Sequence, residues 1–141
     1  AQIVGFSFCF ESGKAFYVPL EHNESTDLSK DVGIKWLKEI LPKNSSKLIG
    51  QNLKYDLAVL SKEGIYLESF LADTMLMSYV LNSTASRHNL DALSEYYLNF
   101  KTIKYEDVIG KGAKKYKSFA DVPIKEAPNY AADYEISKKN T

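Results

Sequence analysis

The sequence has very few of the side chains that bind soft metals or form disulfides. Its 141 residues include one cysteine, Cys9, and two histidines. A single cysteine cannot form an internal disulfide, and Cys9 alternates with Phe8 and Phe10 in a predicted strand, as a small core residue would. The composition also excludes a zinc site with the usual number of cysteine and histidine ligands. Metal chemistry would therefore rely on carboxylates, which suit Mg²⁺ or Mn²⁺.

Long apolar runs and an excess of charge are absent as well. No apolar run approaches the roughly 20 residues that cross a bilayer. The N-terminus does not have a basic region followed by an apolar segment, as a secretory signal would. We therefore expect a cytoplasmic protein with no membrane partner. Because 18 basic residues balance 18 acidic ones, no overall field attracts nucleic acid, and any contact with phosphates must be local.

The length suits a single domain, 1–141, that buries about two thirds of its unfolded surface. Alternating apolar residues predict strands at 3–10 and 15–20, joined as a β-hairpin. A helix is predicted to follow and to run through about Leu41, where Pro42 stops it. Its expected cap is Ser25, Thr26 or Asp27.

The stretch Lys47–Asp56 has the pattern of a strand that leads into a helix. An apolar run ends at Gly50, after which leucines recur at helical spacing. Asn52 lies at the join, where its side chain could cap the helix, and Asp56 lies one turn further on. In open α/β sheets, ligands bind at this edge. The same two residues also fit an ordinary cap and a solvated first-turn acid.

Further helices are predicted downstream. Asp73 and Thr74 would cap a helix over 75–81, with Met75, Leu76, Tyr79 and Val80 in the core. A helix over 89–97 places Leu90, Leu93 and Tyr97 on one face, and a last helix spans 126–138. The segment 101–109 fits either a helix or an extended chain. A lysine-rich loop begins at Gly110 and is either solvated or in contact with phosphates.

The segment Gly50–Asp56, Gly-Gln-Asn-Leu-Lys-Tyr-Asp, closely resembles the second motif of the 3′-5′ proofreading exonuclease domains of bacterial family A DNA polymerases, in the DEDD (DnaQ-like) superfamily. The resemblance covers nearly the whole chain and keeps the family's spacing. It continues through Asp73–Leu76, Ser78–Ser83, Arg87-His88, Lys101–Ile103, Gly110–Gly112 and Tyr130–Ala132. It implies an α/β domain of ribonuclease H-like fold, with a mixed central sheet flanked by helices.

That family hydrolyses phosphodiesters with two divalent ions, held by four carboxylates. By resemblance, Asp56 and Asp133 are the expected metal ligands, and Tyr130 would orient the attacking water. Tyr130 precedes Asp133 by three residues where the family has four, which rotates the hydroxyl by about 100° relative to the carboxylate. The Asp-x-Glu of the family's first strand is absent, and the first acid is Glu11, in a turn. We therefore expect a domain that lacks its first strand, with its last helix also cut short.

The resemblance also implies contacts with the substrate. Gln51 and Asn52 would face the terminal nucleotide, Arg87 would contact a phosphate, and Phe119 would wedge against the terminal bases. Each has a simpler alternative. Gln51 fits a turn residue, Arg87 a surface charge, and Phe119 a core ring.

The leading interpretation is a proofreading exonuclease domain acting on the 3′ end of single-stranded DNA with two Mg²⁺ or Mn²⁺ ions, and linked covalently to a polymerase domain. Without Asp-x-Glu, the 141-residue chain itself is expected to be inactive. A rival interpretation keeps the fold and not the chemistry, as a degenerate structural module of a polymerase. An RNA-trimming relative of the ribonuclease D type is disfavoured, because Arg87-His88 and Lys101–Ile103 resemble the polymerase branch.

Overall fold

The computed structural model describes residues 3–24, 28–110 and 116–131. The chain contains both helices and strands, as the α/β prediction requires. The strands are β1 (Gly5–Glu11), β2 (Lys14–Pro19), β3 (Ile49–Gly50) and β4 (Ala72–Asp73). The helices are α1 (Lys30–Asn44), α2 (Leu53–Lys62), α3 (Thr74–Leu81), α4 (Leu90–Leu98) and α5 (Tyr105–Ile109), with short 3-10 turns η1 (Ser45–Lys47) and η3 (Phe119–Asp121). In the described part of the chain, none of the helices has the length and apolar character needed to cross a membrane.

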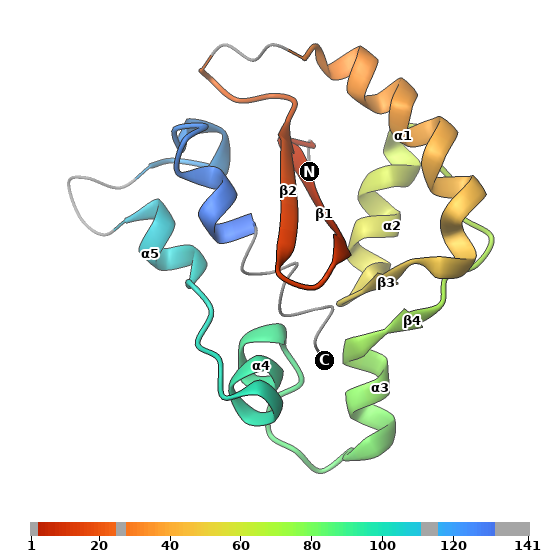
Figure 1. The fold of residues 1–141 in the computed structure, drawn as a ribbon, viewed down its shortest axis with the longest axis vertical. Coiled ribbons are helices and arrows are strands. Elements are labelled where there is room, and N and C mark those ends of the chain that lie inside the picture. Colours follow the sequence, from red (N-terminus) through yellow and green to blue (C-terminus); the bar gives the residue numbers. More distant parts are fainter. Residues whose placement is uncertain (1–2, 25–27, 111–115, 132–141) are drawn as a thin grey trace.

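Strands β1 and β2 form the predicted antiparallel hairpin, which lies in the middle of the fold (Figure 1). Phe6 pairs with Val18, and Ser7 pairs with Tyr17. Because successive side chains of a strand point to opposite faces, Phe6 and Val18 share one face of the hairpin, and Ser7 and Tyr17 share the other. Gly13 has a φ of 79° in the turn, a conformation that glycine adopts at little cost.

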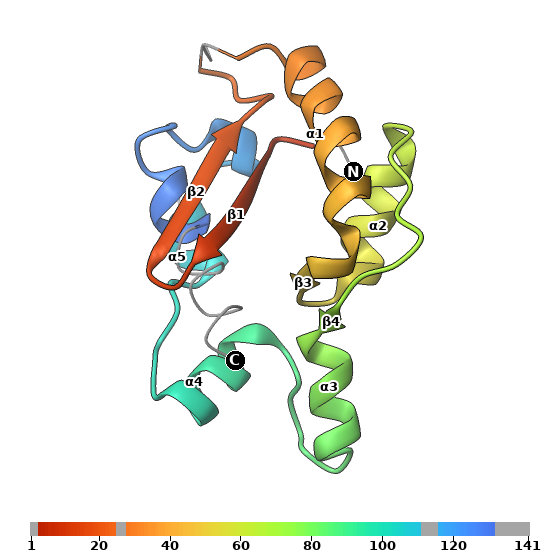
Figure 2. The same ribbon diagram turned by 45° about the vertical axis from the view of Figure 1, so that its right-hand side comes forward.

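Helices lie on both sides of this hairpin, as Figures 1 and 2 show: α1 and α2 on one side, and α5 with the segment 116–131 on the other. Each side has its own apolar core. The core on the α1 side is formed by Ile3, Leu20, Ile34, Leu37 and Ile65, with Phe6 and Val18 packed against it. The core on the α5 side is formed by Ile109, Val122 and Ala127, with Tyr17 packed against it.

Strands β3 and β4 pair in parallel, with Ile49 opposite Ala72 and Gly50 opposite Asp73. In the described residues they form a two-stranded unit separate from the hairpin. Each of these strands leads directly into a helix, β3 into α2 and β4 into α3. Because the carboxyl ends of parallel strands meet at one edge, the first turns of α2 and α3 begin side by side.

Two expectations about α1 were wrong. The helix begins at Lys30, and the hydroxyl of Ser29 accepts the N–H of Val32 as the cap; positions 25–27, where the cap was expected, lie outside the described residues. Pro42 does not stop the helix, which continues to Asn44. Because Pro42 lies in the last turn of the helix, its missing N–H costs little more than one hydrogen bond, and the helix continues past it. The hydroxyl of Ser45 donates to the carbonyl of Pro42.

The expected core positions of α3 and α4 also need correction. Leu76, Tyr79 and Val80 of α3 are exposed, and the buried residues of that helix are Thr74 and Ser78. Tyr97 of α4 is exposed as well. The reason is that α3 turns its polar side inward, where the hydroxyl of Ser78 lies 2.8 Å from Nδ1 of His88.

Downstream of α4 the structure decides between the open alternatives. In the segment 101–109, Tyr105–Ile109 forms the helix α5. Of the last predicted helix, residues 127–131 are helical, Glu126 lies in the preceding turn, and 132–138 lie outside the described residues.

Candidate active site

A cleft of about 400 Å³ opens between the hairpin, the start of α2 and the segment 116–131. We call it the Asp56 cleft. It brings together five of the side chains that the sequence predicted for a site. It is lined by Gly5, Phe6, Ser7, Tyr17, Gln51, Asn52, Tyr55, Asp56, Phe119, Tyr130 and Ala131. The hairpin residues of this lining, and Tyr55, were not predicted from the sequence.

The start of α2 is capped differently from what the sequence predicted. Asn52 does occupy the N-cap position, with a left-handed φ of 57°, but its side chain makes no capping hydrogen bond. The carboxylate of Asp73 takes that role. It accepts the N–H of Asn52 at 3.0 Å and the N–H of Leu53 at 2.8 Å. The side chain of Asn52 is therefore not committed to the helix end and lines the cleft.

Asp73 caps a second helix at the same time. Its carboxylate also accepts the N–H of Met75, 2.9 Å away, in the first turn of α3, as the sequence predicted. Only 5% of the residue is exposed. Burying a carboxylate is costly unless hydrogen bonds compensate it, and here backbone amides from two helix starts supply them. Local sequence gave no sign of the bonds to α2, because they join residues 20 and 21 positions apart.

Gln51 links the start of α2 to the loop before α4. Its Nε2 donates to the carbonyl of His88 at 2.9 Å, and its Oε1 accepts from the hydroxyl of Thr74. Both ends of the amide are thus engaged within the protein. Gln51 lines the cleft as expected, and its contact with a nucleotide stays a prediction.

Tyr17 and His22 form a chain of hydrogen bonds on the hairpin side of the cleft. Nδ1 of His22 lies 3.1 Å from the carbonyl oxygen of Val122, which can only accept, so Nδ1 carries the proton. Nε2 then accepts the hydroxyl of Tyr17 at 2.6 Å. Burial raises the pKa of Tyr17 well above its ordinary value, which keeps this hydroxyl protonated.

Aromatic rings form the opposite wall. The centroid of Phe119 lies 5.7 Å from that of Tyr130 and 6.3 Å from that of Tyr105. Phe119 also meets Tyr17 edge to face at 6.2 Å. The ring of Phe119 therefore packs against the core and also lines the cleft, so a core role and a role in contacting terminal bases are compatible.

Among the described residues, Asp56 is the carboxylate that lines the cleft. Asp56, in the first turn of α2, is exposed and lines the cleft. Asp133 lies outside the described residues, two positions after Ala131, which is part of the lining. Among residues 3–24, 28–110 and 116–131, no three histidine, cysteine, aspartate or glutamate side chains are close enough together to hold a metal ion.

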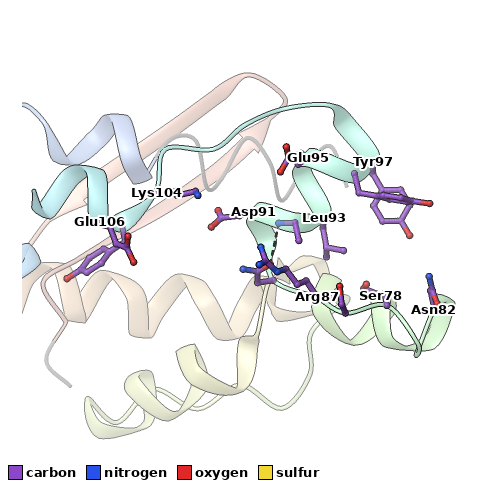
Figure 3. Close-up of a pocket in the computed structure, with 15 residues that line it drawn as sticks. Ser78, Asn82, Arg87, Asp91, Leu93, Glu95, Tyr97, Lys104 and Glu106 are labelled. Atoms are coloured by element: carbon purple, nitrogen blue, oxygen red, sulfur yellow. Dashed lines mark hydrogen bonds between the residues drawn. The ribbon is translucent and has the colours of Figure 1, made fainter. Parts of the chain in front are cut away.

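Arg87 lies in a different hollow. This larger cavity, of about 760 Å³, is lined by residues of α3 and α4, by the loop that joins them and by Lys104–Glu106. We call it the Arg87 cavity, and Figure 3 shows its lining. The structure therefore separates Arg87 from the five site residues of the Asp56 cleft.

A family model described as a 3′-5′ exonuclease matches residues 1–133. DNA polymerase I of Pseudomonas aeruginosa is 43% identical over 138 residues, which is 94% of this chain and 15% of that protein. DNA polymerase I of Borreliella burgdorferi is 33% identical over 133 residues, 94% of this chain and 14% of that protein. The chain thus spans about one seventh of the length of these curated relatives.

A solved structure described as the apo form of the nuclease has a similar fold. Its TM-score is 0.62 at 13% sequence identity, and the match covers 95% of this chain and 58% of that one. The predicted α/β fold of ribonuclease H-like type is confirmed.

Proposed function

The chain belongs to the 3′-5′ exonuclease family, and from this premise we propose that it is the proofreading domain of a DNA polymerase I, which hydrolyses 3′-terminal phosphodiesters of DNA. One observation carries the proposal. Gln51, Asn52, Asp56, Phe119 and Tyr130 come from two distant parts of the sequence and line one cleft. Such convergence of a carboxylate, amides and aromatic rings is what a site for a nucleotide end requires.

Roles follow from the chemistry of these side chains. The ring of Phe119 would stack against a terminal base, and the free amide of Asn52 would hydrogen-bond the terminal nucleotide. The hydroxyl of Tyr130 would orient the attacking water. Asp56 and Asp133 would hold divalent ions, Mg²⁺ or Mn²⁺, because hard cations take carboxylate oxygens. Two such ions, when bound, generate hydroxide and stabilise the leaving oxygen.

The substrate and the partner also belong to the proposal. The relatives are DNA polymerase I proteins about seven times as long as the matched region, which supports a covalently linked polymerase domain. The substrate would then be the 3′ end of single-stranded DNA delivered from that domain. A cytoplasmic location follows from such a parent and stays a prediction.

A degenerate structural module is the second candidate. The observation behind it is that residues 1–49 contain no Asp-x-Glu. Two-metal hydrolysis needs more carboxylates than Asp56 and Asp133 supply. The two candidates therefore differ in whether an upstream strand in the same gene brings the missing acids.

The test is release of 3′-terminal nucleotides from labelled single-stranded DNA in Mg²⁺, using the chain extended by its upstream coding sequence. Asp56→Ala should lower the rate on the order of 100-fold or more, because a metal ligand contributes several kcal/mol to the transition state. Asp31→Ala is the matched control, since Asp31 is likewise an acid in the first turn of a helix, α1, and lies outside the cleft.

The outcomes separate the two candidates. Activity that depends on Asp56 supports the exonuclease. An inactive extended chain whose upstream strand lacks Asp-x-Glu favours the structural module. Equal activity of the parent and Asp56→Ala would place the chemistry elsewhere.

A further inference from the structure

His22 follows β2 closely and is not among the described residues that line the Asp56 cleft, but it contacts two side chains that are. These are Tyr17 and Phe119. Resting on the proposed function, we propose that His22 is a positioning residue. It would hold the ring of Phe119 at the distance from the hairpin at which that ring can stack on the 3′-terminal base.

Three consecutive residues after β2 bind the turn that carries Phe119. Four hydrogen bonds make the connection, and they join parts of the chain that are far apart in sequence. They link Nδ1 of His22 with the carbonyl of Val122 at 3.1 Å, the N–H of Asn23 with the carbonyl of Ala120 at 2.9 Å, the side chain of Asn23 with the carboxylate of Asp121, and the carboxylate of Glu24 with the N–H of Ile124 at 2.8 Å.

The turn η3 is closed by its own hydrogen bonds. The carboxylate of Asp121 accepts the N–H of Ser118 at 2.9 Å, and the N–H of Asp121 donates to the carbonyl of Ser118 at 3.1 Å. Phe119 is the first residue of this turn. Because the turn is closed in this way, its attachment to residues 22–24 sets where the ring of Phe119 lies relative to the hairpin.

Among the three attaching residues, His22 is placed to have the strongest influence. Asn23 and Glu24 are exposed, so water can replace the bonds that their side chains make. Val122 is only 1% exposed, so its carbonyl depends on a partner within the protein. The imidazole of His22 also meets the ring of Phe119 directly, with the two centroids 6.0 Å apart.

Tyr17 fixes the orientation of the imidazole. Its hydroxyl donates to Nε2 of His22 at 2.6 Å, which leaves Nδ1–H to donate to the carbonyl of Val122. Tyr17 in turn lies directly over the backbone of β1, where a Cβ at Gly5 would overlap its hydroxyl. The position of β1 is thus passed through Tyr17 and His22 to the turn that carries Phe119.

The experiment separates the two hydrogen bonds of His22. In His22→Asn, the amide retains an N–H donor near the position of Nδ1, and the bond from Tyr17 is lost. In His22→Gln, the amide lies near the position of Nε2 and can accept from Tyr17, and the carbonyl of Val122 is left unpaired. His22→Leu removes both bonds. Each variant is made alone and together with Phe119→Ala.

The measurement is fluorescence anisotropy of a 5′-labelled thymidine trinucleotide, in EDTA so that no strand is cleaved. The protein is the chain extended by its upstream coding sequence, at a temperature where circular dichroism shows each variant to be folded. The matched control is Ser45→Ala. It removes a largely buried hydroxyl that contacts the distant Ser69 at 3.4 Å, outside the cleft.

We expect His22→Leu and His22→Gln to weaken binding by about 2- to 10-fold, a part of the about 5- to 150-fold that loss of the whole base stack costs. His22→Asn and Ser45→Ala should bind like the parent chain. In the Phe119→Ala background the His22 variants should have no further effect, because the ring that they displace is gone. A role in stability alone would not depend on Phe119 in this way.

Other outcomes overturn the proposal. Equal weakening in His22→Asn and His22→Gln would show that the bond to Val122 does not position the ring, and this pair decides even where His22→Leu does not fold. A loss that persists without Phe119 would assign the effect to another part of the cleft. If all His22 variants bind like the parent and Phe119→Ala still weakens binding, the inference fails and the proposed function stands. If the parent does not bind the trinucleotide, both fail.

Discussion

The two halves of this fold are held together by different chemistry. Around α1 and the hairpin, the buried residues are apolar, with Leu37 and Ile65 among them. The buried polar side chains of the described residues gather instead in β4, α3, α4 and the loop that joins these two helices. These are Asp73, Thr74, Ser78, His88 and Ser94, and Ser45 is the one outside that region. Apolar packing holds elements together without fixing their orientation. Hydrogen bonds hold elements together and fix their relative orientation as well.

The Asp56 cleft lies at the seam between these halves. The hairpin that forms one side of the cleft belongs to the half with apolar buried residues. The start of α2, with Asn52 and Asp56, is fixed by hydrogen bonds of Asp73 and Gln51, which reach the half with polar buried residues. The comparison therefore suggests that stability comes mainly from one half and geometry of the site from the other. The following predictions are arranged to break or sharpen that division.

The largest effect is expected in the apolar core. Leu37 is 4% exposed, so Leu37→Ala should lower the free energy of unfolding by about 2–5 kcal/mol through lost burial and a residual cavity. Denaturant titration measures it. The control is Val32→Ala on the exposed side of the same helix, with a change within about 0.5 kcal/mol. Similar losses in both variants would mean that α1 does not pack as described.

The substitution Asp73→Ser distinguishes the two capping roles of Asp73, at the start of α2 and at the start of α3. Serine can still cap α3, but it is too short to reach the amides of α2. Leaving those amides unpaired should cost about 1–3 kcal/mol. Hydrogen exchange should accelerate at Leu53, whereas Ser29→Ala, which removes the α1 cap, should leave exchange at Leu53 unchanged. Protected Leu53 in Asp73→Ser would show that another group holds the start of α2.

A pH-dependent effect is expected at Tyr17. Burial raises its pKa in the folded state above the ordinary value of 10.0, so the unfolded chain loses this proton first. Its contribution to stability is therefore complete below pH 10 and declines as the pH rises above it. Thermal unfolding between pH 8 and 11 should show a shallower decline in Tyr17→Phe than in the parent. Tyr66→Phe, at an exposed tyrosine, is the control, and parallel curves for all three proteins would contradict the assignment.

The smallest effect is expected on the outer face of α3. Val80 is 86% exposed, so Val80→Ser should change the free energy of unfolding by no more than about 0.5 kcal/mol. Val122→Ser is the buried counterpart, at 1% exposed, and should cost several times as much. A large loss in Val80→Ser would show that this face is covered in solution.

Much of the fold followed from patterns that are local in sequence. Alternation of apolar residues predicted the hairpin, and Gly50, two residues before Asn52, marked the start of α2. Helical spacing could not tell which side of α3 faces inward, because nearly all of its residues are apolar. Pro42 was predicted to end α1, because the sequence does not show how close a proline lies to the end of a helix.

Site residues that belong to a sequence motif could be predicted. Site contacts that depend on the pairing of strands distant in sequence could not. Asn52, Asp56, Phe119 and Tyr130 meet in the cleft as expected. The capping by Asp73 depends on the pairing of Gly50 with Asp73, and no local pattern reports it. Arg87 was placed with the others by motif, although the loop before α4 carries it to the neighbouring cavity.

The distant origin of the α2 cap has a consequence for how the chain folds. A helix pays a high entropic cost for its first turn, and this helix cannot draw on its own N-cap side chain to offset it. The capping carboxylate is synthesised some 20 residues later. On a ribosome, which releases the chain from its N-terminus, the turn that carries Asp56 can mature only after β4 has emerged and paired. Assembly of the cleft is thus a late event, and it is coupled to the cooperative closure of the whole domain.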